Sequence, residues 1–424
     1  MPVPSWTSNP LPLLRDAVLV AIVAIITFLG LCRWFGDYYR VPTGSMEPTL
    51  HGHPTVGDLV FVDKLASRSA CHRHDLVVVG HPSDPTQQLV KRIGACGDDP
   101  DACWIDLRDG DVWLGPDRQR MQREQKDPIE ARAQRVVWAT APSPVALVQS
   151  LLDLRDARMD AGAIELPPLD VGSEGARSML REAACAQRRR SLQGRVVPEG
   201  CLGTARAVDS GYVLATGGLD GVRDDKGVFD CGLELEVQQL PTGMLCTIDA
   251  NGEALTFHWT PADGRVTLWR NGVDVESATL PAIASGAHRV EFGRLDDRAF
   301  LVIDGRADAM FCLARHADWP DGDRTSIRTA EPRTYLHVGA LGTTSMRLGK
   351  VVVFRDLFAV RDRNFSSPGT QGDWPRFVPA GHWFLLGDNA FDSRDSRFFD
   401  AVPSSAYLGR PWFVIGPWPR QRWL

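Results

Sequence analysis

A run without any charged residue, residues 17–32, constrains this chain more than any other feature of its sequence. Sixteen helical residues span about 24 Å, and apolar residues on either side lengthen the run toward the roughly 30 Å hydrocarbon core of a bilayer. Arg15 and Arg33 lie where their long side chains reach the lipid headgroups. We therefore predict a transmembrane helix over about 13–35, within an N-terminal segment 1–36.

A cleaved signal peptide is the competing interpretation of this run. It requires a basic start and a small-X-small cleavage site after the apolar part. Here no Lys or Arg precedes Arg15, and the run ends L-G-L-C-R-W-F, so an uncleaved anchor fits better. The flanking basic residues are balanced, so charge does not set the orientation of the anchor. No second long apolar run follows, which predicts that the remaining residues lie on one side of the membrane.

Charge and cysteine spacing argue against two classes of protein. The net charge is −6 without a basic stripe, so we expect no nucleic-acid partner. No C-x-x-C motif occurs and no His pairs with a Cys at zinc-ligand spacing, so we expect no metal. Apart from Cys32 in the apolar run, the cysteines are even in number, and an oxidising compartment would favour disulfides. Cys96 and Cys103 are the nearest pair and the one we expect to bond.

The sequence pattern divides the chain after the anchor into four parts. Residues 37–119 contain β-rich runs separated by Gly, Pro and Asp turns. Residues 120–195 are polar and partly helix-prone, with Pro-rich breaks, which indicates a variable linker region. Residues 196–355 hold many short strands ended by N-G or D-G turns, which is typical of a β-sandwich. Residues 356–424 return to apolar strands around a polar cluster.

Three polar clusters carry candidate chemistry. Residues 41–50, V-P-T-G-S-M-E-P-T-L, place Ser45 in a turn, and the apolar strand V-K-R-I-G contains Lys91. Residues 387–397, G-D-N-A-F-D-S-R-D-S-R, directly follow the apolar W-F-L-L. Taken singly, these are a solvated loop serine, an edge-strand lysine that discourages aggregation and a hydrogen-bonded turn.

Together, and in this order after a membrane anchor, the clusters resemble those of the type I signal peptidases, which are membrane-bound Ser/Lys proteases. The Gly-Asp pairs at 57–58 and 97–98 match further family positions. The family segment R-G-D-[IV]-V-x-F is matched with His74 in place of the glycine. In the last cluster Ala390 and Phe391 stand where Arg and Asp are usual, which removes two side chains from local ion pairs.

The resemblance implies the catalytic residues. Ser45 would be the nucleophile and Lys91 the general base, which must be neutral and therefore buried against apolar walls that lower its pKa. The Ser45 backbone N–H and the Thr43 hydroxyl would form the oxyanion hole. This mechanism requires neither a metal nor an organic cofactor.

The last cluster would support these residues. The resemblance implies that Ser393 hydrogen-bonds and orients the lysine amine, and that Asp395 and Arg397 brace the loop as an ion pair. Gly387 and Asp388 are the first residues of the matched motif.

The long segment between the lysine and the last cluster is an insertion. Lys91 and Gly387 lie 296 positions apart, far more than in compact members of that family. The run G-A-H-R-V-E-F-G-R-L-D-D-R-A-F-L-V-I-D-G-R resembles a hairpin of laminin-G or concanavalin-like jelly rolls. A glycan or protein ligand stays open, as does an insertion without ligand, and Trp259 and Trp269 either stack on a sugar or lie in the core. We expect the ends of the insertion to lie close together.

The fold class expected is mainly β: an N-terminal transmembrane helix, an antiparallel β catalytic domain and an inserted, jelly-roll-like β-sandwich. The function implied is an endopeptidase that removes signal peptides after small residues at −3 and −1. Its partners would be signal peptides of exported preproteins and the lipid bilayer. It would be a single-pass protein of the cytoplasmic membrane, with its catalytic domain on the extracytoplasmic side. The alternative is a membrane-tethered binding protein that uses the inserted sandwich on an inactive protease frame.

Overall fold

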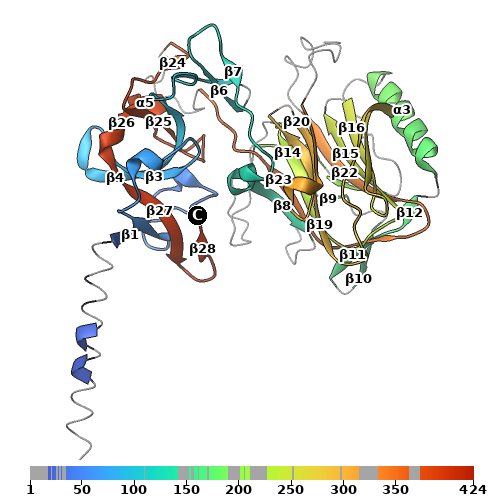
Figure 1. Ribbon diagram of the computed structural model, residues 1–424, viewed down its shortest axis with the longest axis horizontal. Coiled ribbons are helices and arrows are strands. Elements are labelled where there is room, and N and C mark those ends of the chain that lie inside the picture. Colours follow the sequence, from blue (N-terminus) through green and yellow to red (C-terminus); the bar gives the residue numbers. More distant parts are fainter. Residues whose placement is uncertain are drawn as a thin grey trace, which may run out of the picture.

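The computed structural model is built mainly from antiparallel β-sheets, which form two bodies (Figure 1). It describes residues 18–20, 22–24, 27, 30, 35–108, 110–141, 152–153, 157–160, 162–169, 171–189, 201–204, 206–210, 227–250, 253–296, 298–314, 333–361 and 373–424.

The first body joins the N-terminal and C-terminal parts of the chain in one sheet. Strand β27 lies between β2 and β3, and β25 pairs with β4. The sheet contains β1 (Gly36–Arg40), β2 (Leu59–Asp63), β27 (Tyr407–Gly416), β3 (Leu76–His81), β4 (Asp84–Cys96), β25 (His382–Leu386) and β26 (Val402–Pro403), with β28 (Arg422–Trp423) on β27. A smaller sheet has the order β24 (Arg376–Phe377), β5 (Trp104–Arg108), β6 (Asp111–Gly115) and β7 (Gln122–Arg123).

The strands of the first body form where the sequence predicts them. The β-branched and apolar runs become β2, β3 and β4. In β2, Val60 and Val62 are buried while Leu59 and Phe61 are half-buried, as alternation of side chains along a strand requires. This alternation directs one face of the sheet into the core beneath the first polar cluster.

The second body has two further sheets. One contains β10 (Arg158–Asp160), β11 (Ala163–Leu166), β23 (Met346–Arg355), β14 (Cys231–Gln239), β19 (His288–Leu295), β20 (Arg298–Ile303) and β21 (Met310–Ala314), with β8 (Val136–Ala141) on β23. The other contains β18 (Val273–Thr279), β17 (Arg265–Arg270), β16 (Glu253–Thr260), β15 (Gly243–Ala250), β22 (Thr334–Leu341), β13 (Leu202–Thr204) and β9 (Leu152–Asp153), with β12 (Pro168–Leu169) on β22.

These two sheets share one hydrophobic core, so the second body is a β-sandwich. Leu235 and Val351 reach the core from one sheet, and Ile248 and Phe257 reach it from the other. The N-G signal between β17 and β18 is a tight turn in which Asn271 has a φ of 50° and Gly272 a φ of 76°.

Residues 120–195 contribute strands to the sandwich as well as the helix that their composition predicts. The helix is α3 (Ser173–Arg189), but β8 and β11 also lie in this region and pair with β23. A description of 120–195 as a variable linker is therefore incomplete. The β-rich run V-V-W-A-T-A was the signal for β8.

Helix α3 packs on the outer side of one sheet of the sandwich. Ala176 and Leu180 are buried against Trp269, and the Arg177 guanidinium lies 4.9 Å from the centre of the Trp269 ring. Trp269 and Trp259 are both fully buried, so these rings are core residues and do not present a sugar-stacking surface.

The N-terminal segment leaves the first body at β1 (Figure 1). Among the residues that the structure describes, no helix has the length and apolar character needed to cross a bilayer. Most of the predicted anchor, 13–35, lies outside the described residues.

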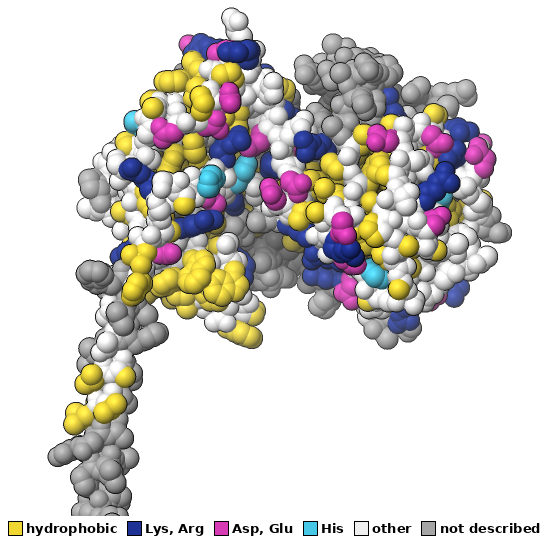
Figure 2. Space-filling view, in the orientation of Figure 1, with side chains coloured by type: hydrophobic (Ala, Val, Ile, Leu, Met, Phe, Trp, Pro, Cys, Tyr) yellow, Lys and Arg dark blue, Asp and Glu magenta, His cyan; other side chains and the backbone are white. Residues whose placement is uncertain are grey.

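Large apolar side chains are exposed near this segment. Figure 2 shows a hydrophobic area at the base of the first body, beside the N-terminal segment. Trp412, Trp418, Trp423 and Tyr38 are all more than half exposed, and the ring centres of Trp412 and Trp423 are 5.0 Å apart. Exposure of several neighbouring aromatic side chains to water is unfavourable.

The expected disulfide between Cys96 and Cys103 is wrong, because both thiols are free. Cys103 Sγ lies 3.6 Å from the carbonyl oxygen of Pro116. Cys96 packs beside Trp383, and burial raises the pKa of its thiol to about 11.

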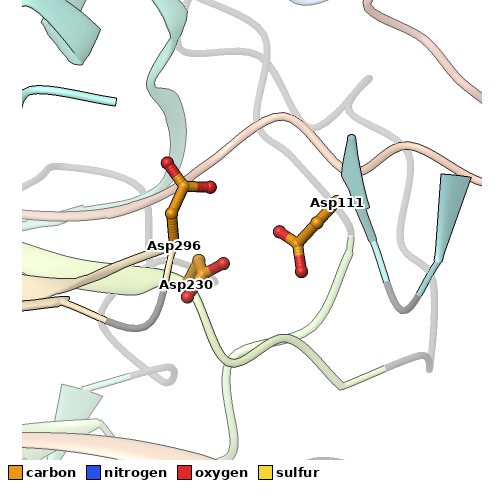
Figure 3. Close-up of side chains that lie close together, drawn as sticks. All are labelled: Asp111, Asp230 and Asp296. Atoms are coloured by element: carbon orange, nitrogen blue, oxygen red, sulfur yellow. The ribbon is translucent and has the colours of Figure 1, made fainter. Parts of the chain in front are cut away.

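Three carboxylates meet where the two bodies join (Figure 3). Asp111 belongs to β6, Asp230 precedes β14 and Asp296 follows β19, and one oxygen from each lies within 4.8 Å of the others. Arg123 donates to Asp111 and, at 2.8 Å, to Asp230. Lys126 Nζ lies 3.7 Å from Asp296. The joint is therefore a buried network of opposite charges.

Burial shifts the acid groups of this joint. It raises the pKa of Asp111 well above its usual range, and the neighbouring Asp230 carboxylate adds to the shift. Burial likewise raises the pKa of Asp296 to about 7, although the nearby Lys126 ammonium opposes the change. Protonation at mildly acidic pH therefore relieves repulsion at the joint.

We expect Asp296→Asn to stabilise the protein at pH 8. Between the unfolded pKa of about 4 and the folded pKa of about 7, the native state binds a proton that the unfolded chain does not. The contribution of Asp296 protonation to the free energy of unfolding is therefore fully present below about pH 4. It is lost as the pH rises through about 7. The variant should gain about 1–3 kcal/mol of unfolding free energy at pH 8 and little at pH 4, measured by denaturant unfolding.

The matched control is Asp308→Asn, since Asp308 is exposed on the same sandwich. It should leave the fall in stability from pH 4 to pH 8 unchanged. An Asp296→Asn protein with the wild-type pH dependence would contradict the assignment.

Candidate active site

Ser45 lies in a short 3-10 turn, η1 (Gly44–Met46), between β1 and β2. Met46 and Leu50 are fully buried and anchor this loop on the sheet, and the Leu50 amide donates to the Met46 carbonyl at 2.8 Å. Ser45 itself is only partly buried. The loop is thus fixed by its apolar residues while the serine stays accessible.

Lys91 lies in β4 opposite Val77 of β3 and is 2% exposed. Its Nζ donates a hydrogen bond of 2.7 Å to Ser45 Oγ. The residues predicted as nucleophile and base are therefore in direct contact. A lysine amine at this distance accepts the proton of the serine hydroxyl when the amine is neutral.

Asp388 connects the last cluster to the other two. Its buried carboxylate accepts hydrogen bonds from Arg92 Nε at 2.8 Å, from Arg92 Nη2 at 2.6 Å and from Thr49 Oγ1 at 2.5 Å. Arg92 follows Lys91 in β4, and Thr49 belongs to the same loop as Ser45. One carboxylate therefore fixes the strand of the base against the loop of the nucleophile.

Asn389 forms two hydrogen bonds with backbone carbonyls of the nucleophile loop. Its side-chain Nδ2 donates to the Gly44 carbonyl at 3.0 Å, and its amide donates to the Ser45 carbonyl at 3.2 Å. Sequence reasoning assigned no role to Asn389, Arg92 or Thr49. The available signal was their position inside the three clusters.

Asp395 and Arg397 form the ion pair that the resemblance implied. Two parallel hydrogen bonds of 2.8 Å join them, and Asp395 also accepts from the Gly387 amide at 2.9 Å. Burial alone would raise the pKa of Asp395, but the Arg397 guanidinium more than offsets this and holds that pKa below its usual value. Asp395 also caps the short helix α5 (Ser396–Phe399).

Ser393 does not make its predicted hydrogen bond with the Lys91 amine. Its Oγ is buried and has no hydrogen-bond partner among the described residues. The side chain instead fills the space beside Gly387, where a Cβ atom would lie 2.0 Å from Ser393 Oγ. Thr43 is exposed at the start of η1 and makes no side-chain capping bond, so its part in an oxyanion hole stays a prediction.

Asp111, Asp230 and Asp296 form the one group of three or more potential metal ligands among the described residues. Arg123 and Lys126 already supply positive charge there. The group contributes nothing to the contact between the serine and the lysine, and we assign no metal to it.

Likenesses to solved structures are weak. The chain aligns with the exoplasmic/lumenal domain of VIP36 in its Ca²⁺/Man3GlcNAc-bound form at a TM-score of 0.29 and 9% identity, covering 59% of this chain and 97% of that one. A β-1,3-glucanase from Mycobacterium marinum aligns at 0.21 and 15% identity, covering 37% and 74%. Scores this low support no conclusion about shared fold or function.

Curated relatives match only part of the chain. Signal peptidase I of Aquifex aeolicus is 34% identical over 87 residues, which are 20% of this chain and 32% of that protein. Signal peptidase I of Mycobacterium tuberculosis is 38% identical over 73 residues, which are 16% and 25%. The chain thus spans about a third or less of the length of these relatives.

The protein-family comparison matches two segments, residues 14–122 and 329–417, to signal peptidase, peptidase S26. These segments contain all three polar clusters and leave out most of the β-sandwich. These two segments, which make up less than half of the chain, are similar to the signal peptidase family, peptidase S26.

Proposed function

We propose that this protein is a membrane-bound serine endopeptidase that removes signal peptides from exported preproteins. The observation that carries the proposal is the 2.7 Å contact between Lys91 Nζ and Ser45 Oγ. It lies inside the segments that match the signal peptidase family.

The reaction would follow the serine–lysine route. Neutral Lys91 takes the proton of Ser45 as Oγ attacks the scissile carbonyl, and the resulting ammonium then gives this proton to the leaving amine. The signal peptide stays on Ser45 as an ester. Lys91 then takes a proton from water as the water oxygen attacks the ester carbonyl, the bond from Ser45 Oγ to the acyl carbon breaks, and the Lys91 ammonium returns the proton to Ser45 Oγ. Thr43 Oγ1 and the Ser45 amide would bind the oxyanion.

The supporting contacts explain how the dyad is held. Asp388 and Asn389 tie the nucleophile loop to the last cluster, so the serine does not need to be ordered when substrate binds. Holding reacting groups in advance is worth several orders of magnitude in rate. Ser393 supports the loop by packing against Gly387.

The membrane attachment is part of the proposal. The apolar run at 13–35 would anchor the chain, with the catalytic body on the extracytoplasmic side. The exposed rings of Trp412, Trp418 and Trp423 lie in the same body and suit a bilayer interface, where aromatic side chains gather. The substrates would be signal peptides with small residues at −3 and −1.

The proposed arrangement is an anchor (1–36) and a catalytic domain in two parts (37–119 and 356–424). Between them lie the region 120–195, which also supplies β8 and β11 to the sandwich, and a laminin-G or concanavalin-like sandwich (196–355). A ligand of the sandwich is not needed for the proposal. A binding protein on an inactive frame would have no need of the buried contact between lysine and serine.

We expect Ser45→Ala and Lys91→Ala each to abolish cleavage of a preprotein, and the double variant to be no worse than either. The two residues act as one unit, so their losses do not add. Cleavage is measured by appearance of the mature chain on gels, with Lys64→Ala as the control because Lys64 forms only an exposed ion pair with Asp37. Activity above a few per cent in Lys91→Ala would remove the lysine as base, and no cleavage by the wild type would favour the binding protein.

The double variant Trp412→Ala/Trp418→Ala should lose activity only at the membrane. Loss of buried aromatic area weakens the seating of the body on the bilayer. We expect kcat/KM to fall about tenfold for a preprotein in vesicles and to stay unchanged for a soluble peptide. Equal losses on both substrates would mean that these rings support the fold instead. Phe377→Ala, another exposed ring, is the control.

A further inference from the structure

Two short segments connect the first body to the sandwich. We name residues 122–126 the first stem and residues 356–361 the second stem. The stems meet through Lys126 Nζ and the Asp356 carboxylate, so the ends of the insertion lie together as expected. Contacts of both stems continue into the catalytic clusters.

The first stem reaches the strand of the lysine through one buried carboxylate. Glu124 accepts a hydrogen bond from His74 Nε2 at 2.8 Å and forms an ion pair with Arg73, whose Nη1 lies 3.1 Å from Glu124 Oε1. The His74 carbonyl accepts from Arg92 Nη1 at 2.6 Å. Since Arg92 follows Lys91, the first stem is two contacts away from the base.

His74 adopts a backbone conformation that favours glycine. Its φ is 73°, and a side chain in this region costs roughly 1–2 kcal/mol. The family motif has glycine at this place. His74 adopts this strained conformation, and its imidazole ring forms a hydrogen bond with the Glu124 carboxylate.

The second stem holds the last cluster through Arg397. Arg397 Nη1 donates to the Val360 carbonyl at 3.0 Å and to the Ala390 carbonyl at 2.9 Å. The same guanidinium orients Asp395, which binds the Gly387 amide. The stem backbone therefore completes the set of acceptors around the arginine.

The second stem also contributes an aromatic contact. Phe358 stacks on Phe391 with ring centres 6.2 Å apart and planes at 20°. The ring is seated over Gly110, where any Cβ atom would lie 2.5 Å from it. Phe391 stands where the family motif has aspartate, so the position that loses a local ion pair gains a contact with the stem.

We propose that the sandwich positions the catalytic loops through its two stems, with Glu124 and Phe358 as positioning residues. His74 and Phe391, where the sequence departs from the family pattern, are the residues that these stems touch. The insertion is then a working part of the peptidase. The kinetic part of this inference rests on the proposed serine–lysine mechanism, whereas the structural part does not.

Hydrogen exchange tests the structural part in the full-length protein. The Gly387 and Asn389 amides donate inside the catalytic loop, so their exchange rates report its opening. We expect Phe358→Ala to raise both rates about tenfold. Phe377→Ala should leave them unchanged. Wild-type rates in Phe358→Ala would overturn the proposal, as would an equal rise at Val351 in the sandwich core, which reports global unfolding.

Steady-state kinetics test the consequence for catalysis. Phe358→Ala and Glu124→Ala should each lower kcat about tenfold and leave KM within about twofold, because small displacements of reacting groups cost rate. Phe358→Ala/Phe391→Ala should be no worse than Phe358→Ala alone, since both remove one stack. Phe358→Tyr keeps the ring and should recover most of the rate. Folded Phe358→Ala and Glu124→Ala proteins with wild-type kcat would contradict the proposal.

Ser45→Ala separates this inference from the proposed function. If cleavage survives in Ser45→Ala, or if the wild type cleaves nothing, the proposed function fails, and the exchange measurement still decides the positioning by the stems. If Ser45→Ala is inactive and Phe358→Ala changes neither exchange nor kcat, the proposed function stands and the positioning fails.

Discussion

The arrangement of the serine and the lysine depends on the hydrogen bonds that the Asp388 carboxylate accepts. This carboxylate accepts from Arg92 on the strand of the lysine and from Thr49 on the loop of the serine. Removal of one partner from a buried charge pair leaves an uncompensated charge, which costs about 3–5 kcal/mol. The 2.7 Å contact between Lys91 and Ser45 therefore needs an anion that the chain supplies 296 positions after the arginine.

This long separation is compatible with folding because the sandwich closes its own ends. The entropy lost on closing a flexible loop grows with the logarithm of its length. Lys126 and Asp356 contact each other, so the folded sandwich presents the first body with a short connection. Strand β25 then pairs with β4, and β27 pairs with β2 and β3, although the insertion separates them in the sequence.

Much of the catalytic cluster was predictable because its motifs resemble those of a known family. That resemblance implied the pairing of Ser45 with Lys91 and the ion pair of Asp395 with Arg397. Other features depend on contacts that no local pattern encodes. Ser393 turns toward Gly387 because of the loop conformation.

The strands at 136–169 depend on pairing with strands that lie far away in the sequence. The free thiols of Cys96 and Cys103 depend on where the fold directs the two side chains. A polar stretch with Pro-rich breaks can still supply edge strands when a partner such as β23 is present. Two cysteines near each other in sequence bond only when their side chains converge, and Cys103 instead turns toward the Pro116 carbonyl. The stems escape sequence reasoning for the same reason, because Phe358 and Phe391 carry no shared motif.

The charges at the joint explain how the stems hold the sandwich in one orientation relative to the catalytic loops. Arg123 and Lys126 neutralise carboxylates of the sandwich, while Glu124 between them binds His74 of the first body. Buried ion pairs contribute little net stability, but a shift that unpairs them is costly, so they select one orientation. A rotation of the sandwich relative to the first body would separate Arg123 from Asp230. The acidic joint thus fixes the orientation in which the second stem meets the last cluster.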